Sequence, residues 1–393
     1  MSDKSIAGDQ FRSARNPASR LHFIDNWRSA LIILVVLHHL ALTYGAGASW
    51  YYVEPPWNSP LAFLVFLVFI LINQSWFMGA LFLISGYFTP GSFEHKGAGS
   101  FLKDRTVRLG IPLVVFVFVL NPIASIGFYQ MPASLTGITS PLTWQSYPHL
   151  VGVGPLWFIA MLLIFDFGYA AWRAITRNRA PRLTMRPAPP GYFAIGIFVL
   201  ALTLASYLVR VAVPMGKYVL GFPTFAYLPQ YLSFFVVGII ASRGNWLRTI
   251  SSKMGRVGLI MAVAGSVLLF PLALSGLPLS LADIGTNFTG RGHWQSAVYA
   301  LWDSSVSVGV CLFLIVFFRR FFRRPRRVGK FLSQQNYTVY VIHAPLIVLV
   351  AVLLKGIELE HLLKFSLAAA IALPLCFALA YLLRKLPGVS RIL

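Results

Sequence analysis

Residues 24 to 45 have the sequence IDNWRSALIILVVLHHLALTYG. It begins with polar residues that include Arg28, and it then runs apolar apart from two adjacent histidines, His38 and His39. A run of this kind predicts a membrane-spanning helix, which needs roughly 20 apolar residues. An imidazole inside such a helix is costly unless it faces protein or water, so the helix is also predicted to carry a functional site.

The two histidines differ in their relation to Arg28. Arg28 and His39 are eleven positions apart, which at ~100° per residue is about 20° past three full turns. The two side chains therefore share one helix face, ~16 Å apart along the axis. We expect Arg28 at one membrane surface and His39 near the middle, whereas His38 is turned ~80° away from Arg28.

The composition of the whole chain is that of a membrane protein. Its 393 residues are 57% hydrophobic and only 11% charged, whereas about a quarter of the residues in a soluble domain are charged. The net charge of +22 falls in short clusters between apolar segments, which favours membrane topology over nucleic-acid binding. Cys311 and Cys376 both lie in apolar segments, so they predict neither a disulfide nor a metal site.

Ten apolar segments are long enough to cross a bilayer. The predicted fold class is therefore all-α, a polytopic integral membrane protein with about ten transmembrane helices. The second segment is long and carries Asn73 and Gln74 midway, which leaves open whether it forms one helix or two. The ten segments are approximately residues 28–46, 60–88, 109–129, 154–174, 191–213, 223–242, 256–277, 295–318, 336–355 and 361–383.

The basic residues are divided very unequally between the two sides of a ten-span chain. Of the 33 Lys and Arg residues, only five lie on one side, and the other 28 lie on the side of the termini. The positive-inside rule therefore places both termini in the cytoplasm. The predicted organisation is a cytoplasmic polar tail over residues 1–23, a ten-helix membrane domain over 24–385 and a cytoplasmic tail over 386–393. The five exceptions are Arg210, Lys217, Arg291, Lys355 and Lys364.

Arg28 and His39 are the candidate reaction centre. A neutral imidazole accepts a proton from a hydroxyl, and burial favours the neutral form, while a guanidinium at the membrane surface suits phosphate binding. The alternative is that Arg28 only anchors the helix end and that His39 hydrogen-bonds a neighbouring helix. Arg105 and Arg108 lie three positions apart, and they are likewise candidates either for phosphate binding or for anchoring.

Other polar residues inside apolar segments are costly unless they are paired. Asp303 is a candidate for orienting an acceptor or for pairing with Arg210, whereas Asp166 and His343 either belong to the site or are hydrogen-bonded structural residues. The dense basic run RRFFRRPRRVGK, residues 319–330, is predicted to bind anionic membrane lipids.

Several motifs together resemble the membrane-bound acyltransferase-3 family. Members of that family pair an Arg with a His eleven positions later on the first helix, as Arg28 and His39 do. Further similar segments follow in the family's order. They are LFLISGYF at residues 81–88, the RxxR pattern of KDRTVRLGIP at Arg105 and Arg108, GPLWFI at 154–159, and HWQSAVYALWDS and SQQNYTVYVIHAPLI, which resemble the subgroup of glucan-modifying succinyltransferases.

The resemblance implies an O-acyltransferase of the plasma (inner) membrane. It would move an acyl group, acetyl or succinyl, from cytoplasmic acyl-CoA to a hydroxyl of an extracytoplasmic or membrane-linked carbohydrate, and no metal is implied. His39 would be the essential histidine, as a general base or a transient acyl carrier. Arg28 would either contact the donor's phosphates or hold the surroundings of His39, and Arg105 and Arg108 would bind the phosphates of CoA. The candidates for substrate binding are Asp303, Trp157 and His343.

The rival interpretation is a polytopic transporter or flippase for a sugar or a lipid-linked substrate. It explains the spans and the buried charges, but it does not explain the spacing of Arg28 and His39 or the ordered motifs.

Overall fold

The structure, a computed structural model, describes residues 21–45, 49–54, 59–176, 187–223, 225–275, 287–324 and 326–393. Within these ranges ten helical segments are long and apolar enough to cross a membrane. The predicted all-helical, multi-pass fold is therefore confirmed, while most of the predicted tail 1–23 lies outside the described residues. The ten segments are α2 (His22–Thr43), α3 (Pro60–Lys96), Ala98–Gln130, Trp144–Thr176 with α9 (Trp157–Thr176), α10 (Tyr192–Ala212), Phe225–Gly244 with α11 (Leu228–Gly244), α13 (Ser252–Leu274), α15 (Trp294–Phe321), α16 (Arg327–Leu353) and α17 (His361–Lys385).

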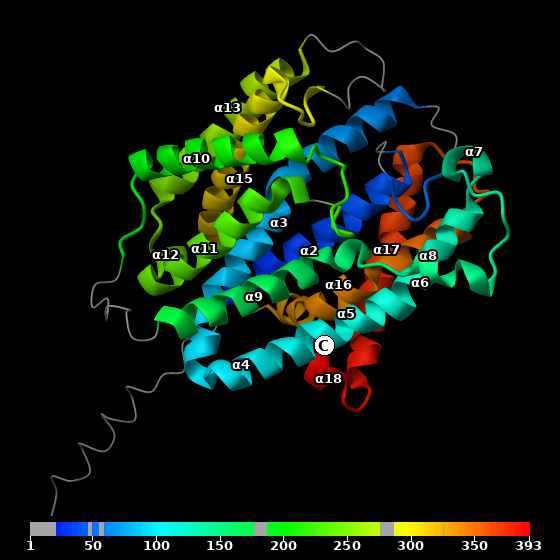
Figure 1. Cartoon of the computed structure of the whole chain (residues 1–393), viewed down its shortest axis with the longest axis horizontal. Helices are drawn as coiled ribbons and strands as arrows, with labels where there is room; N and C mark the ends of the chain where they lie inside the picture. Colours follow the sequence, from blue (N-terminus) through cyan, green and yellow to red (C-terminus); the bar gives the residue numbers. More distant parts are fainter. Residues whose placement is uncertain are drawn as a thin grey trace, which may run out of the picture.

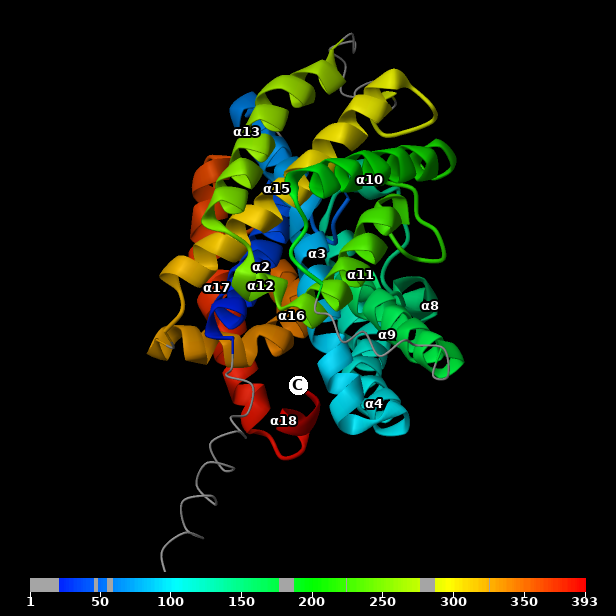
Figure 2. The same cartoon turned by 90° about the vertical axis from the view of Figure 1, so that its left-hand side faces the viewer.

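The helices α2 and α16 pack against each other in the middle of the bundle, with α3, α15 and α17 around them (Figure 1). The helices α10 and α13 lie on the outside, beside α15 (Figure 2). Their exposed faces carry large apolar side chains such as Leu200, Leu204, Ile260 and Val267. Lipid tails are as apolar as these side chains, so such faces are stable in a bilayer.

The helix α3 answers the question that its sequence leaves open. Its first turn is capped by the Ser59 hydroxyl, which accepts a hydrogen bond from the Ala62 amide at 3.2 Å. The helix then runs without a break through Asn73 and Gln74 to Lys96. At about 1.5 Å per residue its 37 residues span ~55 Å, which exceeds the ~30 Å hydrocarbon layer, so the helix is tilted or projects beyond that layer.

The third span is not a regular α-helix. Short α-helical pieces, α4 (Ala98–Arg105), α5 (Ile111–Val115) and α6 (Asn121–Ser125), alternate with π-helical turns at Thr106–Gly110 and Phe116–Leu120. Such π-turns inside helices occur frequently at functional sites. Here the first π-turn begins directly after Arg105, and it contains Arg108.

Small residues allow α3 and α11 to approach closely. A Cβ atom at Gly86 would lie 2.1 Å from the Phe235 carbonyl oxygen, and one at Gly238 would lie 2.3 Å from the Leu83 carbonyl oxygen. Any larger side chain at either position would push the two helices apart, because backbone atoms cannot give way. This crossing fixes the position of α3 in the bundle. The turns of α3 before the crossing carry residues of the candidate site.

Candidate active site

The C-terminal half of α2 lines a cavity of about 430 Å³, here called the histidine cavity. Both His38 and His39 line it, so the structure brings together two residues that the helical register separates. Neighbouring residues of α2 point ~100° apart around the helix axis. The cavity surrounds enough of the helix to be lined by both side chains. Seven aromatic side chains form part of its remaining wall. They are Trp50, Tyr51, Phe77, Phe128, Trp157, Tyr218 and Tyr340.

His39 is held by a second histidine from α16. The His39 Nδ1 atom lies 3.1 Å from the His343 Nε2 atom, and the His343 Nδ1 atom lies 2.7 Å from the Tyr340 carbonyl oxygen. The His39 ring is also stacked on Trp50, with centroids 4.1 Å apart. These contacts occupy the Nδ1 atom of His39 and fix its ring. The His39 side chain is also part of the cavity wall.

His38 has a different set of neighbours. Its Nδ1 atom lies 3.3 Å from the Asn73 side-chain nitrogen, and its ring is stacked on Phe77 at a centroid distance of 5.2 Å. The rings of His38 and His39 are nearly perpendicular, with centroids 5.5 Å apart. The two imidazoles therefore present different edges to one cavity.

Another part of the cavity wall contains a close contact at Gly154. Here the Tyr51 hydroxyl donates a hydrogen bond to the Asn121 side-chain oxygen, and the Asn121 amide donates to the Leu150 carbonyl at 2.5 Å. Burial raises the pKa of the Tyr51 phenol, so it stays protonated and remains a donor. Gly154 has φ +42°, and a Cβ atom there would lie 2.1 Å from the Tyr51 hydroxyl, which makes glycine necessary.

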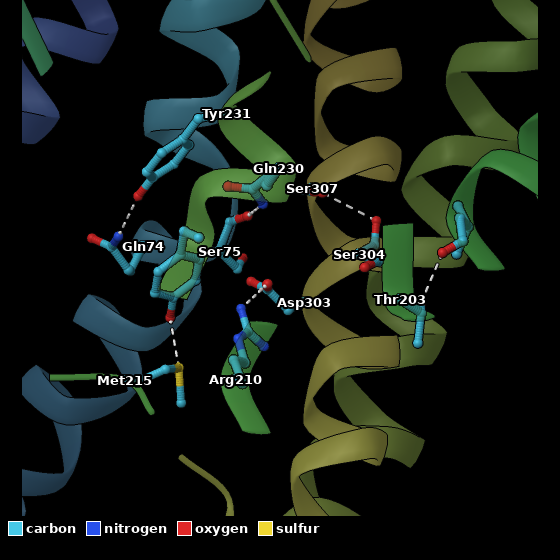
Figure 3. A network of polar contacts seen from close by, with 12 residues as sticks. Gln74, Ser75, Thr203, Arg210, Met215, Gln230, Tyr231, Asp303, Ser304 and Ser307 are labelled. Carbon is cyan, nitrogen blue, oxygen red and sulfur yellow. Dashed lines mark hydrogen bonds and ion pairs between the residues drawn. The ribbon is translucent and has the colours of Figure 1, made fainter. Parts of the chain in front are cut away.

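The predicted substrate residue Trp157 does line the histidine cavity, and so does Gln74. The Trp157 ring is stacked on Tyr231 with centroids 5.1 Å apart, and the Gln74 amide donates to the Tyr231 hydroxyl at 3.1 Å (Figure 3). Both residues are thus fixed by the same tyrosine of α11.

Near the start of α2, the structure forms a second cavity of about 570 Å³, here called the arginine cavity. It brings together all three arginines that the sequence predicts for phosphate binding, Arg28, Arg105 and Arg108. Two arginines that the prediction missed, Arg384 at the end of α17 and Arg391 in α18 (Val389–Ile392), line it as well. The sequence signal for these two was only their membership in a C-terminal basic cluster.

Carboxylates partly neutralise the arginine cavity. The Arg105 Nε atom lies 3.0 Å from the buried Asp166 Oδ2 atom, and the Asp166 Oδ1 atom accepts a hydrogen bond from the Thr89 hydroxyl at 3.0 Å. Arg108 pairs with Asp104 at 3.1 Å, and Arg28 lies 3.7 Å from Asp25. Paired guanidiniums keep further N–H groups for a ligand, because each has five donors.

The two cavities lie back to back, with Tyr340 in the wall of both. Its hydroxyl donates to the Pro155 carbonyl at 2.5 Å, which holds the ring in place. Ile32 lines the arginine cavity and Val35, about one turn later on α2, lines the histidine cavity. Together the cavities extend along the α2 face that the sequence identified.

Two predicted substrate residues do not line the histidine cavity. His343 is fully buried behind His39. Asp303 is buried in α15, where its carboxylate forms an ion pair with Arg210 of α10 at 2.7 Å (Figure 3). The structure thus shows the pairing alternative for Asp303. Among the described residues there is no group of three or more His, Cys, Asp or Glu side chains that could hold a metal ion.

Comparison with known proteins agrees with this arrangement. A family model described as an acyltransferase domain matches residues 21–385. Glucans biosynthesis protein C of Salmonella schwarzengrund (strain CVM19633) is 25% identical over 236 residues, which are 57% of this chain and 59% of that protein. The same-named protein of Escherichia coli (strain K12 / DH10B) is 27% identical over 156 residues, 38% of this chain and 37% of that protein. Because the family model covers most of its length, this chain belongs to the acyltransferase-3 family.

Proposed function

We propose that the protein transfers a short acyl group from acyl-CoA to a carbohydrate hydroxyl within the membrane. The observation that supports this most directly is the pair of back-to-back cavities, one lined by arginines and one by histidines, that share Tyr340. Two such compartments suit a reaction between a polyanionic donor and a neutral acceptor, with a reactive group near their boundary.

The arginine cavity suits the donor. CoA carries a pyrophosphate and a further phosphate, and guanidinium groups bind phosphate oxygens through paired N–H donors. In this proposal Arg28, Arg105 and Arg108 bind these phosphates with Arg384 and Arg391. The extended pantetheine arm then follows α2 past Tyr340 and carries the thioester toward His39.

The histidine cavity suits the acceptor. Its aromatic wall provides apolar faces for sugar rings, and its polar groups provide hydrogen-bond partners for hydroxyls. His39 acts on the acceptor hydroxyl as a general base. The relatives are named for glucan biosynthesis, which favours a glucan or a similar carbohydrate as the acceptor.

The distribution of basic residues supports the orientation of this proposal. The arginine cavity faces the cytoplasm and the histidine cavity faces the opposite side of the plasma (inner) membrane. Arg28 and Arg384 line one cavity, so both ends of the membrane domain lie on the same side. In this orientation the exposed arginines of the basic run 319–330 bind anionic lipid at the cytoplasmic surface of the membrane.

The test is transfer by the purified protein in detergent or liposomes. Wild-type protein should release free CoA from acetyl-CoA or succinyl-CoA when a glucan acceptor is present, and the acyl ester should appear on the glucan. The His39→Ala variant should lose ~10³-fold in kcat, within the range typical of general acid–base residues. His95→Ala serves as the control, because His95 is exposed at the end of α3.

Two outcomes would contradict the proposal. One is movement of a sugar across liposomes without consumption of thioester, which indicates a transporter. The other is full transfer by His39→Ala.

A further inference from the structure

The histidine cavity contains two adjacent imidazoles whose partners differ in hydrogen-bonding character. Building on the proposed acyl transfer, we propose that His343 and Asn73 hold His39 and His38 in opposite tautomers. His39 then presents a bare Nε2 atom that accepts a proton. His38 presents an Nε2–H group that donates a hydrogen bond to the carbonyl oxygen of the thioester.

The tautomer of His39 follows from a chain of contacts that begins at Tyr340. The Tyr340 carbonyl oxygen can only accept, so the His343 Nδ1 atom 2.7 Å away carries the proton. In a neutral His343 ring the Nε2 atom is then an acceptor. The His39 Nδ1 atom, 3.1 Å from it, must therefore be the donor. This assignment leaves the lone pair of His39 on Nε2.

The tautomer of His38 follows from Asn73. The Asn73 side-chain nitrogen carries two hydrogens and no lone pair available for bonding, so it donates to the His38 Nδ1 atom 3.3 Å away. A neutral His38 that accepts at Nδ1 carries its proton on Nε2. Stacking on Phe77 keeps the ring in this position.

This pairing divides two tasks that acyl transfer requires. The His39 Nε2 atom takes the proton of the acceptor hydroxyl while the hydroxyl oxygen bonds to the thioester carbonyl carbon. The carbonyl electron pair moves onto its oxygen, which accepts a hydrogen bond from His38 Nε2–H. As that pair returns, the carbon–sulfur bond breaks and the departing thiolate takes the proton from His39 Nε2. The products are the ester and free CoA, and both rings regain their starting state.

His343 is a positioning residue in this scheme, because it touches His39 and not the substrate. Its fully buried side chain and its place one turn from Tyr340 on α16 explain why an ionisable residue is retained there. The acceptor that His343 supplies favours the tautomer of His39 with the proton on Nδ1.

Nitrogen NMR of protein labelled with ¹⁵N-histidine tests the tautomers without relying on activity. The His38, His39 and His343 signals are assigned by replacing each residue in turn with Gln. We expect the proton on Nδ1 in His39 and in His343, and on Nε2 in His38. Asn73→Asp should reverse His38, because a carboxylate accepts only. Equal tautomers in His38 and His39 would overturn the inference even if the protein transfers acyl groups.

Kinetics test what the tautomers do. His343→Leu should lower kcat by ~10²-fold or more with little change in either KM. His343→Gln should retain at least ~10 times the activity of His343→Leu, because its side-chain oxygen can accept from His39 Nδ1–H. Likewise His38→Gln keeps an N–H donor, so it should exceed His38→Leu, for which a loss of ~10²–10³ in kcat is expected.

Thr203→Val is the matched control. Its hydroxyl bonds only to the Val199 carbonyl of the same helix (Figure 3), away from both cavities. Thermal melts confirm that each variant is folded. Equal activity of the Leu and Gln variants at both positions would overturn the inference, whereas a wild-type protein that releases no CoA would instead overturn the proposed function.

Discussion

Two of the polar clusters inside the membrane domain differ in whether they reach a cavity. His38 and His39 line an open chamber, whereas Arg210 and Asp303 are 0% and 1% exposed and pair with each other. In the sequence both clusters look alike, as costly groups in apolar segments. The comparison indicates that such a group is a candidate for catalysis when it faces a cavity and a structural element when its partner encloses it.

The enclosed cluster is held by more than its ion pair. The Arg210 guanidinium lies over the Tyr227 and Tyr299 rings at 4.7 and 5.4 Å, so aromatic faces provide part of its stabilisation. The pair joins α10 to α15 and thereby holds an outer helix to the centre of the bundle.

The largest expected effect tests this distinction. Asp303→Asn leaves a buried guanidinium without its anion, so the free energy of unfolding should fall by about 3–5 kcal/mol. Replacing both partners with apolar residues, Arg210→Met with Asp303→Leu, should recover most of this loss. Thermal or chemical unfolding in detergent measures the change.

The open cluster should behave in the opposite way. His39→Ala should lower kcat by ~10³-fold and leave the melting temperature within a few degrees of wild type. If Asp303→Asn instead keeps its stability and loses acceptor binding, Asp303 belongs to the acceptor site after all.

A smaller effect is expected in the arginine cavity. In the proposed function Arg108→Ala removes a cation that binds a phosphate of the donor. A hydrogen bond to a charged group is worth about 1.5–3 kcal/mol, so the KM for acyl-CoA should rise ~10-fold or more with kcat nearly unchanged. Lys253→Ala is the control, because Lys253 is an exposed cation at the start of α13. An unchanged KM would leave Arg108 as an anchor of the helix end, the alternative that the sequence allows.

The smallest effect is expected from the wall of the histidine cavity. Gly154→Ala must accommodate a methyl group against the Tyr51 hydroxyl at a positive φ, which costs on the order of 1–3 kcal/mol. We expect a rise of severalfold in the acceptor KM with the donor KM unchanged, measured by initial rates at varied glucan. A donor KM that rises instead would show that the two cavities are not separate compartments.

Much of the fold could be predicted from the sequence, because hydropathy reports directly which segments fit the hydrocarbon layer. The helix ends were less predictable. α16 begins at Arg327, nine residues before the predicted 336, and α3 continues past 88 to Lys96. In both cases the helix continues through polar residues at the membrane surface, where hydropathy gives no signal.

The geometry of the candidate site was predictable only along one helix. Register placed Arg28 and His39 on one face, since that relation is local. The contact of His39 with His343 joins residues 304 positions apart. Arg28 and Arg384, which line one cavity, are even further apart in the chain. A single sequence carries no record of such contacts, because they arise from helix packing.

The position of Tyr340 has a consequence for the cell as well as for the reaction. Two cavities that enter a bundle from opposite ends would, if joined, form a water-filled path across the bilayer. A path of that kind lets protons flow down their gradient. The Tyr340 ring, held by the Pro155 carbonyl, stands in the wall that the cavities share. The residue that borders both cavities is therefore also part of the electrical insulation of the membrane.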